Sequence, residues 1–466
     1  MALGTEAYVP VLVVTRLLED GQYNNSTFAN TIGYDTVFAG WNFEGRLNYT
    51  ETENETNIPL PFSSGATVGG TVDVTNIDDP GLFLTQTGQP GTDVNINLLD
   101  YPATFGLIFA NLIETEATSI KADLFKEKEI GGLPTELKFG AQFGTREATG
   151  GDTLVFGGFP SSIDINQFTT GIPWSADFRN TIGATNVNNV ALDDAWDAAA
   201  DRTIAFDDDS LISIEEDILS VYAQGTTEFS WGNIVYGVRV EQTDFSSSGT
   251  RLVDGVAGAV SESNDYSNFL PSIHANINLT EDVKLRLSAS SGLSRPTYSE
   301  IRASEAIDPI DIDPDAAEGT PSFEVSGGNP GLDPEESYGV DVSLEWYFAD
   351  ASLLSIGAYH RRIDNVIYPG STEISGVNFA PIAPGLIDAT DVGTFNSFFN
   401  GEDGELTGFE INFLGTAEDW LPDPFDGLGA SGNVTFVDSE FTAPTLGNQT
   451  FSLPGTSETI YIASIF

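Results

Sequence analysis

The chain has 466 residues, with 70 Asp and Glu against 17 Lys and Arg, a formal net charge of −53, and no cysteine. This charge disfavours nucleic acid as a partner, because neutralising phosphates requires Lys and Arg. The missing cysteines exclude disulfides and thiolate metal sites. The longest apolar run, 103–113, is too short for a transmembrane helix. The first residues show no signal-type apolar core, so a targeting segment would have to precede this sequence.

Alternating apolar and polar residues predict strands in the first half of the chain. The candidates are 7–17, 36–50, 134–146 and 233–246. Each is expected to place its apolar and polar side chains on opposite faces, because side chains in a strand alternate with a period of two. In 233–246, for example, Val238 and Val240 alternate with Arg239 and Glu241.

The second half contains the clearest hairpin, at 266–293, followed by predicted strands at 339–348, 408–414 and 457–466. Together with weaker candidates, the pattern predicts about thirteen strands. Burying the charged face of these strands in a dry core without partners would cost free energy. A lumen filled with water or with a plug avoids that cost, because the charged side chains stay hydrated or paired.

The connections between these strands alternate in length. Tight turns are expected near 128–133, 230–232, 280–282, 349–351 and 417–425, and long polar connections near 147–212, 247–265, 294–334, 368–403 and 440–456. Transmembrane β-barrels have short turns at one end and long loops at the other. Aromatic residues also gather at the tight turns, namely Phe229, Trp231, Trp346, Tyr347, Phe348 and Trp420. Aromatic girdles of this kind mark membrane interfaces.

These patterns predict an all-β protein: an antiparallel transmembrane β-barrel with short periplasmic turns and long extracellular loops. The last predicted strand ends with the sequence, and open sheet edges are not tolerated in lipid. We therefore expect the chain to be part of a larger barrel.

Several segments resemble TonB-dependent outer-membrane receptors, in the variant with long loops. The segment 268–301 carries Leu-Pro-Ser at its start and Arg295–Pro296 after the next strand. Similar matches follow in GGNPGLDPEESYGVDVSLEWYF (327–348) and GELTGFEINF (404–413), and precede it in 120–147 and in 214–243, which includes YGVRVEQT. The matches cover roughly 117–466, whereas 1–116 holds weaker strands and a long loop.

The resemblance implies a barrel domain over 1–466 that lacks the family's N-terminal plug and TonB box. By resemblance, the whole protein would be a receptor in the outer membrane of a Gram-negative bacterium and would import a scarce nutrient, an oligosaccharide or a ferric siderophore. Its partners would be outer-membrane lipid and lipopolysaccharide, the nutrient, and the TonB energy-transducing complex through the missing plug. This part alone is not expected to transport. The resemblance implies no enzyme activity and no cofactor.

Ligand contact in such barrels comes from loops and the lumen wall. Loop aromatics at Trp174, Phe178 and Trp196 are candidates for stacking on sugar rings, although they could equally pack the loop's own core. An acidic loop offers looser cation binding through Asp308, Asp311, Asp313, Asp315 and Glu318, although Ala316 and Ser322 rule out an EF-hand. A second acidic group spans 207–217. Neither His274 nor His360 has the neighbours that a catalytic triad needs.

Two alternatives remain open at this point. A passive porin-like barrel explains the alternation, girdles and loops equally well, and it differs by lacking a plug. A secreted acidic β-rich binding protein, or a glycosidase with paired carboxylates, is the second. Extraction without detergent would favour this second alternative.

Overall fold

A computed structural model gives the structure of the chain and describes residues 6–63, 65–76, 79–159, 163–175, 179–198, 204–310, 319–418, 424 and 427–466. The chain forms two compact units, each assembled from separate stretches of sequence. Unit 1 comprises Met1–Ser26, Glu53–Ile113 and Gly151–Asp207, and unit 2 comprises Thr27–Thr52, Glu114–Gly150 and Asp208–Phe466. None of the helices in the described ranges is long and apolar enough to cross a bilayer.

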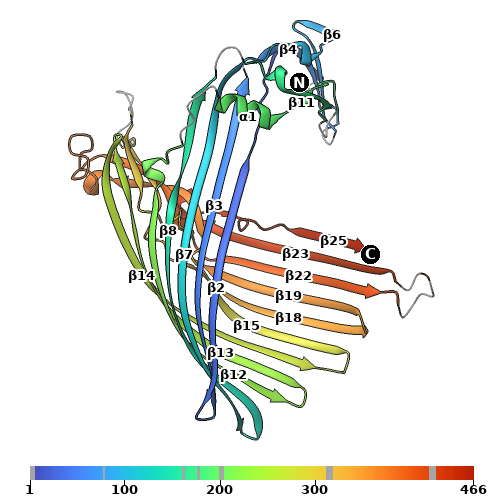
Figure 1. Ribbon diagram of the computed structural model, residues 1–466, viewed down its shortest axis with the longest axis vertical. Coiled ribbons are helices and arrows are strands. Elements are labelled where there is room, and N and C mark those ends of the chain that lie inside the picture. Colours follow the sequence, from blue (N-terminus) through green and yellow to red (C-terminus); the bar gives the residue numbers. More distant parts are fainter. Residues whose placement is uncertain are drawn as a thin grey trace. The chain divides into compact units, whose positions relative to one another are not determined.

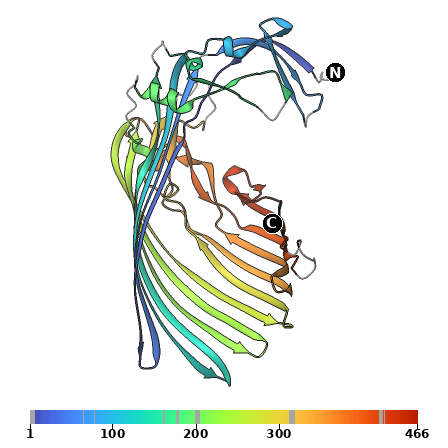
Figure 2. The ribbon, with the colours of Figure 1, turned by 45° about the vertical axis from the view of Figure 1, so that its right-hand side comes forward.

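Unit 2 is dominated by one curved antiparallel sheet (Figures 1 and 2). Among the described residues, thirteen strands follow one another in it, and the segments 22–26, 53–63, 103–113 and 151–158 of the first four belong to unit 1. The strands are β2 (Gln22–Phe38), β3 (Trp41–Ser63), β7 (Ala103–Ile130), β8 (Leu133–Gly158), β12 (Ile212–Phe229), β13 (Gly232–Val253), β14 (Val256–Asn278), β15 (Val283–Ser294), β18 (Glu335–Ala349), β19 (Ser352–Asp364), β22 (Gly404–Thr416), β23 (Gly429–Ala443) and β25 (Thr459–Ile465). The number agrees with the predicted thirteen or so, although the predicted set included 7–17, which does not belong to this sheet. The described pairings join β25 to β23, and none joins β25 to β2.

The two faces of this sheet differ as the period of two requires. One face, called here the apolar face, carries exposed side chains such as Phe139, Val240, Ile273, Val340, Ile356 and Phe409. The opposite face, called here the polar face, carries residues such as Arg239, Glu241, His274, Asp341 and Arg361. The alternation predicted for these strands is therefore confirmed.

Tight turns join the strands at one end of the sheet, as predicted, for instance at Gly131–Gly132 between β7 and β8. Aromatic rings gather beside these turns. Phe229 and Trp231 stack with their ring centroids 4.7 Å apart, and Phe348 stacks on Phe413 with a centroid distance of 6.1 Å. Trp420 of the predicted girdle lies outside the described residues.

Two predicted boundaries are wrong because tight turns were overlooked. The predicted strand 36–50 is divided by a turn at Ala39 and Gly40, whose φ angles are 53° and 75°. The predicted long connection 247–265 is instead a hairpin, since β13 and β14 continue to a turn at Asp254 and Gly255 with φ of 48° and 74°. Positive φ at both central residues is typical of the type I′ hairpin turn, for which Asp-Gly is a preferred sequence.

The other long connections of unit 2 contain short strands: β16 (Glu305–Pro309), β17 (Phe323–Gly327), β20 (Ile367–Ser375), β21 (Val392–Asn400) and β24 (Gln449–Phe451). Two small hydrophobic clusters hold them. One surrounds Phe323 and Ile307, and the other surrounds Val366 and Tyr368.

Unit 1 contains a small sheet, ordered β1 (Glu6–Val14), β4 (Ala66–Asp73), β5 (Gly81–Gln86) and β10 (Arg179–Asn180), with β6 (Gln89–Asp93) beside β5. A separate pair joins β9 (Thr169–Pro173) to β11 (Thr185–Val187). The predicted strand at 7–17 therefore exists as β1, but it pairs with β4 and is not a barrel strand.

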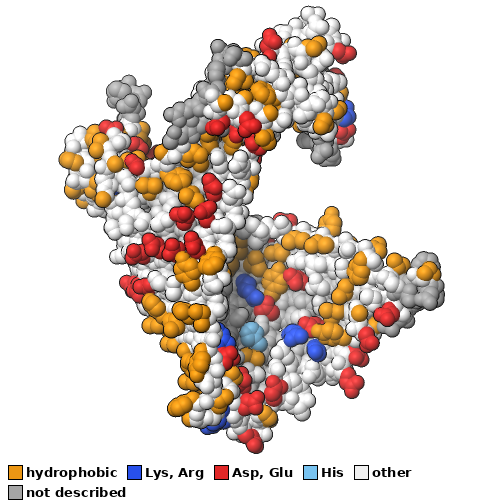
Figure 3. All heavy atoms as spheres, in the orientation of Figure 1, with side chains coloured by type: hydrophobic (Ala, Val, Ile, Leu, Met, Phe, Trp, Pro, Cys, Tyr) orange, Lys and Arg blue, Asp and Glu red, His pale blue; other side chains and the backbone are white. Residues whose placement is uncertain are grey.

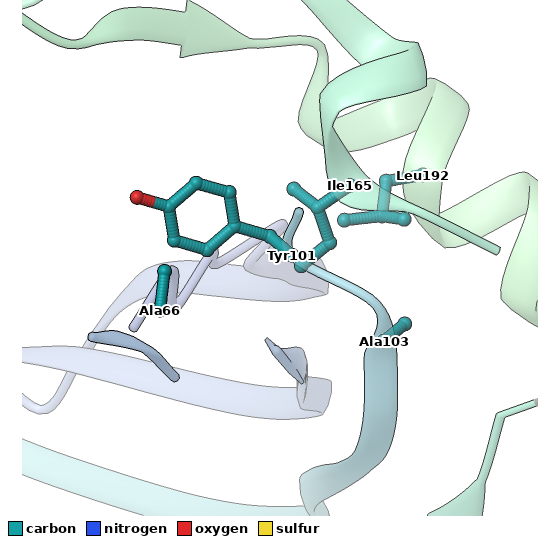
Figure 4. Close-up of a cluster of buried hydrophobic side chains, with 5 residues drawn as sticks. All are labelled: Ala66, Tyr101, Ala103, Ile165 and Leu192. Carbon is teal, nitrogen blue, oxygen red and sulfur yellow. The ribbon is translucent and has the colours of Figure 1, made fainter. Parts of the chain in front are cut away.

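The core of unit 1 is apolar and well buried. Tyr101, Ile165 and Leu192 are each 0% exposed, and Ala66 and Ala103 complete their cluster (Figure 4). Leu192 comes from α1 (Asn189–Asp197), which begins after Asn188, whose side-chain oxygen accepts a hydrogen bond from the Ala191 N–H at 3.1 Å. Such capping satisfies a backbone N–H that the helix itself leaves without a partner. Short 3₁₀ helices lie at Ile96–Leu98, Ile165–Phe168, Asp208–Ser210, Gly376–Asn378 and Pro444–Leu446.

Candidate functional site

The most concentrated charge on the polar face surrounds Glu241 of β13. Its carboxylate accepts hydrogen bonds from Arg239 Nε at 2.5 Å and from Arg295 Nη2 at 2.7 Å. Ser220 of β12 also links Arg239 to Glu241. Its hydroxyl accepts a hydrogen bond from Arg239 at 2.7 Å and donates one to Glu241 at 3.2 Å. Glu241 is 7% exposed, so the two arginines compensate a carboxylate that is nearly removed from water.

Glu216 of β12 extends this network. It accepts from Arg146 Nη1 of β8 at 3.3 Å, and its other oxygen lies 3.4 Å from Arg295 Nε. Burial would lower the pKa of Arg295, but the hydrogen bond to Glu241 and the nearby negative charges outweigh burial and raise that pKa. Three guanidinium groups therefore face two carboxylates.

Arg146, Arg239, Glu241 and Arg295 line a pocket of about 170 Å³ on the polar face, together with Gln142 and Ser220. The pocket lies towards the long-connection end of the strands, because Glu216 is near the start of β12. Arginine is well suited to bind carboxylate or phosphate groups through paired N–H donors. The surplus guanidinium gives the pocket the chemistry to hold an anionic or hydroxylated group.

A second polar cluster surrounds Asp123 of β7. Lys121 and Lys138 both lie 3.4 Å from its carboxylate, and Tyr222 donates a hydrogen bond to it. Asp123 is 3% exposed. Arg239 lies 5.4 Å from the Tyr222 ring centroid, so this cluster adjoins the Glu241 network.

Further along the polar face, a pocket of about 470 Å³ is lined by His274, Asn276, Arg286, Ser288 and Asp341, among others. Arg286 donates to Glu345 at 2.7 Å and to Asn276 at 2.8 Å, and Arg361 of β19 donates to Asp341 at 2.6 Å. Figure 3 shows basic and acidic side chains and a histidine on this hollowed side of the sheet. The polar face thus offers hydrogen-bonding groups over much of its length.

The structure separates the three aromatic candidates. Trp174 follows β9 and is 42% exposed, so part of its side chain is accessible to a ligand. Trp196 is 0% exposed: it lies in α1, packs with Ile108 and Ala110, and stacks on Phe159 at 4.9 Å. The expected ligand contact at Trp196 is therefore replaced by core packing. Phe178 lies outside the described residues.

The acidic candidates give no assembled site. Asp308 is exposed on β16, where it lies opposite Glu324 of β17, whereas Asp311, Asp313, Asp315 and Glu318 lie outside the described residues. Among residues that the structure describes, no group of three or more metal-ligating side chains is placed to hold an ion.

The network around Glu241 was not predicted as a unit. The alternation places Arg239 and Glu241 on the polar face, and this was visible in the sequence. Arg295 is 54 residues away and comes after β15, and Arg146 belongs to another strand. Only the strand pairing brings these groups together.

A sheet with one exposed apolar face, one charged face, and short turns at one end defines the chain as a transmembrane β-barrel protein. The model of the TonB-dependent receptor-like β-barrel family matches residues 14–463, so the chain belongs to this family. Proteins of this family are receptors of the outer membrane of Gram-negative bacteria. No curated protein matches the chain.

Several solved structures are similar over nearly the whole chain. The ferric-catecholate import receptor Fiu from Escherichia coli K12 is 12% identical, with a TM-score of 0.46, and the match covers 99% of this chain and 68% of that one. The unliganded ferric citrate transporter FecA is 10% identical, with a TM-score of 0.48, and the match covers 97% of this chain and 58% of that one. The hemophore receptor HasR of Serratia marcescens is 10% identical, with a TM-score of 0.39, and the match covers 98% of this chain and 68% of that one. The chain thus spans 58 to 68% of the length of these three proteins.

Proposed function

We propose that this chain is the barrel of an outer-membrane receptor that takes up a scarce nutrient with energy supplied through TonB. The observation that carries the proposal is the polar face of unit 2, where paired charges and hydrogen-bonding groups line the sheet from the Glu241 network to Asp341. A polar solute crossing a membrane needs such a wall, because it exchanges its hydration for fixed polar groups.

The proposed location is the outer membrane of a Gram-negative bacterium. Phe139, Ile273 and Val340 are between 46 and 54% exposed on the apolar face. In water, so wide an apolar surface would cause aggregation, whereas in hydrocarbon it is the expected surface. Outer-membrane lipid and lipopolysaccharide are therefore the proposed surroundings, and contact with TonB is assigned to a plug, which the family's barrels enclose.

Two substrate classes are compatible with the site. A ferric siderophore would use the one positive charge in excess among Arg146, Arg239 and Arg295, because siderophore complexes present oxygen-rich, commonly anionic surfaces. An oligosaccharide would use the neutral hydrogen-bonding groups of the 470 Å³ pocket in unit 2. In unit 1, Trp174 is a separate candidate for stacking on a sugar ring.

The proposal is tested in the source bacterium, using the full-length protein that contains this chain. Uptake of radio-iron siderophores and labelled oligosaccharides is compared between the parent, a deletion strain and the complemented strain, with and without an uncoupler. We expect one substrate class to lose uptake in the deletion strain and in the uncoupled parent. Uptake that survives the uncoupler would instead identify a passive porin-like barrel, and release of the protein without detergent would identify a secreted binding protein.

Substitutions then separate the substrate classes. Arg146→Ala should reduce siderophore uptake and leave sugar uptake unchanged, whereas Trp174→Ala should do the reverse. Arg179→Ala, which removes an arginine paired with Asp73 and Asp79 in unit 1, is a control for general loss of an arginine.

A further inference from the structure

The connection between β15 and β18 begins with an ordered segment, 295–304, which is called here the strap. It contains one helical turn, in which the N–H groups of Glu300 and Ile301 both donate to the Thr297 carbonyl, at 3.0 and 3.2 Å. The Thr297 N–H in turn donates to the Glu300 carboxylate at 2.6 Å. Ile301 is 5% exposed, so the turn buries an apolar side chain. The strap therefore has its own local structure, and its two ends are fixed in different ways.

The end of the strap is fixed to β13 and its neighbourhood by uncharged contacts. The Ala303 N–H donates to the Ser247 hydroxyl at 2.8 Å, and the Ser304 hydroxyl donates to the Leu211 carbonyl at 2.7 Å. Ser247 and Ser304 are both 0% exposed. Gly249 permits this approach, because a Cβ atom at that position would overlap the Ser304 hydroxyl oxygen. Since these contacts are fully buried, a dissolved ion does not reach them.

The start of the strap is fixed by charge. Arg295 donates to Glu241 at 2.7 Å and to the Thr243 hydroxyl at 3.1 Å, and its Nε lies 3.4 Å from Glu216. The Arg295 side chain is 21% exposed and lines the 170 Å³ pocket of the Glu241 network. This ionic anchor can therefore be reached from the pocket, in contrast to the neutral anchor at the other end.

Arg295 is the cation in excess at this anchor. Among the described residues, Arg239 pairs with Glu241 and Arg146 pairs with Glu216, so each carboxylate keeps a guanidinium partner when Arg295 leaves. Taking away the last partner of a buried carboxylate is strongly destabilising, because the charge is then left uncompensated. That cost does not arise here. An anion in the pocket can take Arg295 as its partner while both carboxylates stay paired.

We propose that the pocket binds an oxyanion, such as a carboxylate or a phosphate, through Arg295, and that this binding releases the start of the strap. The oxyanion replaces Glu216 and Glu241 as the partner of Arg295, and no covalent bond changes. The neutral anchor stays in place, so the helical turn moves away from the polar face and opens the pocket. The role of this release in uptake rests on the proposed function, to which it adds an anionic nutrient and a means of uncovering the wall.

Hydrogen exchange of the full-length protein in detergent measures the strap directly. The salts compared are sodium phosphate, sodium acetate and sodium chloride at equal ionic strength, so that charge screening is the same in all three. We expect the amides of 297–301 to exchange about fivefold to tenfold faster in phosphate or acetate, the range for a partly exposed charged hydrogen bond. The amides of 303–307 should keep their protection. A response to either probe supports the proposal and identifies the preferred group, whereas equal exchange in all three salts overturns it.

Substitutions of two arginines should have opposite effects. Arg295→Gln detaches the start of the strap, so 297–301 should exchange rapidly in every salt. Arg146→Gln leaves Arg295 as the remaining cationic partner of Glu216 among the described residues, so the strap should stay protected and should lose its response to the probes. Faster exchange in both variants would show a purely structural role and would overturn the proposal, as would a response that persists in Arg295→Gln.

Arg251→Gln is the matched control. Arg251 of β13 pairs with Glu305, just beyond the strap, so this variant removes an ion pair of the same connection and leaves the residues of the pocket intact. It should keep the response of 297–301, and loss of the response would contradict the assignment to Arg295. The comparison of salts in the parent protein needs no variant, so the proposal stays testable if a variant does not fold.

The outcome for the strap is separable from that for the proposed function. Equal exchange in all three salts, in a protein that supports energised uptake, would refute only the release of the strap. Uptake that survives the uncoupler would refute the proposed function, whereas a response of 297–301 to phosphate would still support the oxyanion site at Arg295.

Discussion

The two units of this protein are stabilised by different kinds of contact. Unit 1 buries apolar side chains completely: Val68, Tyr101, Leu192 and Trp196 are all 0% exposed. In the sheet of unit 2 the long strands carry exposed apolar side chains on one face and paired charges on the other. Unit 1 therefore follows the rules of a protein in water, whereas the strands of unit 2 follow those of a protein in lipid.

This difference predicts that removing a large buried side chain destabilises unit 1 strongly. Trp196→Ala should destabilise unit 1 by about 3–5 kcal/mol, because it leaves a cavity beneath Phe159, Ile108 and Ala110. Hydrogen exchange of the full-length protein should then show lost protection in α1 while the strands of unit 2 keep theirs.

Trp174→Ala provides the matched comparison. Trp174 is 42% exposed, so its removal should have a small effect on exchange and should act on ligand uptake instead. Equal loss of protection in both variants would contradict the division between a core tryptophan and a surface tryptophan.

The second prediction concerns the charged face of unit 2. Glu241→Gln leaves Arg239 and Arg295 without their shared carboxylate and should destabilise the sheet by about 2 kcal/mol. The figure is below that for a fully buried pair, because the side chains of Arg239 and Arg295 retain 32% and 21% exposure. Urea unfolding in detergent or lipid measures it, with exposed Glu262→Gln as the control. A change no larger than that of the control would show that the network contributes charge to the wall but little stability.

The same contrast explains how far sequence reasoning reached. The strand pattern, the strand number and the polarity of the two faces could be predicted, because a period of two is visible residue by residue. The turn at Asp254 and Gly255 was also visible, as an Asp-Gly pair, but Ser, Thr and Gly around it do not produce an apolar face. Contacts such as Arg295 to Glu241 depend on strand pairing over long distances. The burial of Trp196 depends on Phe159 and Ile108, whose positions no local pattern fixes.

A smaller effect is expected from charge repulsion along the apolar face. Glu147 of β8 lies directly opposite Glu215 of β12, and both are exposed. Like charges in this position repel, so Glu147→Lys should stabilise unit 2 by about 0.5 kcal/mol. The gain should shrink as salt is added, because exposed charges are screened. Glu147→Gln separates lost repulsion from new attraction, and a destabilised Lys variant at low salt would contradict the pairing.

The smallest expected effect is a pH dependence in unit 1. The hydrogen bonds from Thr75 and from Arg179 keep the pKa of Asp73 below its usual value, and Arg179 also lies 3.0 Å from Asp79. A carboxylate with a lowered pKa in the folded state stabilises that state above its unfolded pKa, and this stabilisation is lost as the pH falls through the lowered value. Protection of β4 and β5 in unit 1 should therefore decline as the pH drops below about 4, the ordinary value for an aspartate. Asp73→Asn should flatten this decline, whereas Asp93→Asn on the neighbouring β6 should leave it intact. An unchanged pH profile in Asp73→Asn would assign the acid sensitivity of unit 1 to other carboxylates.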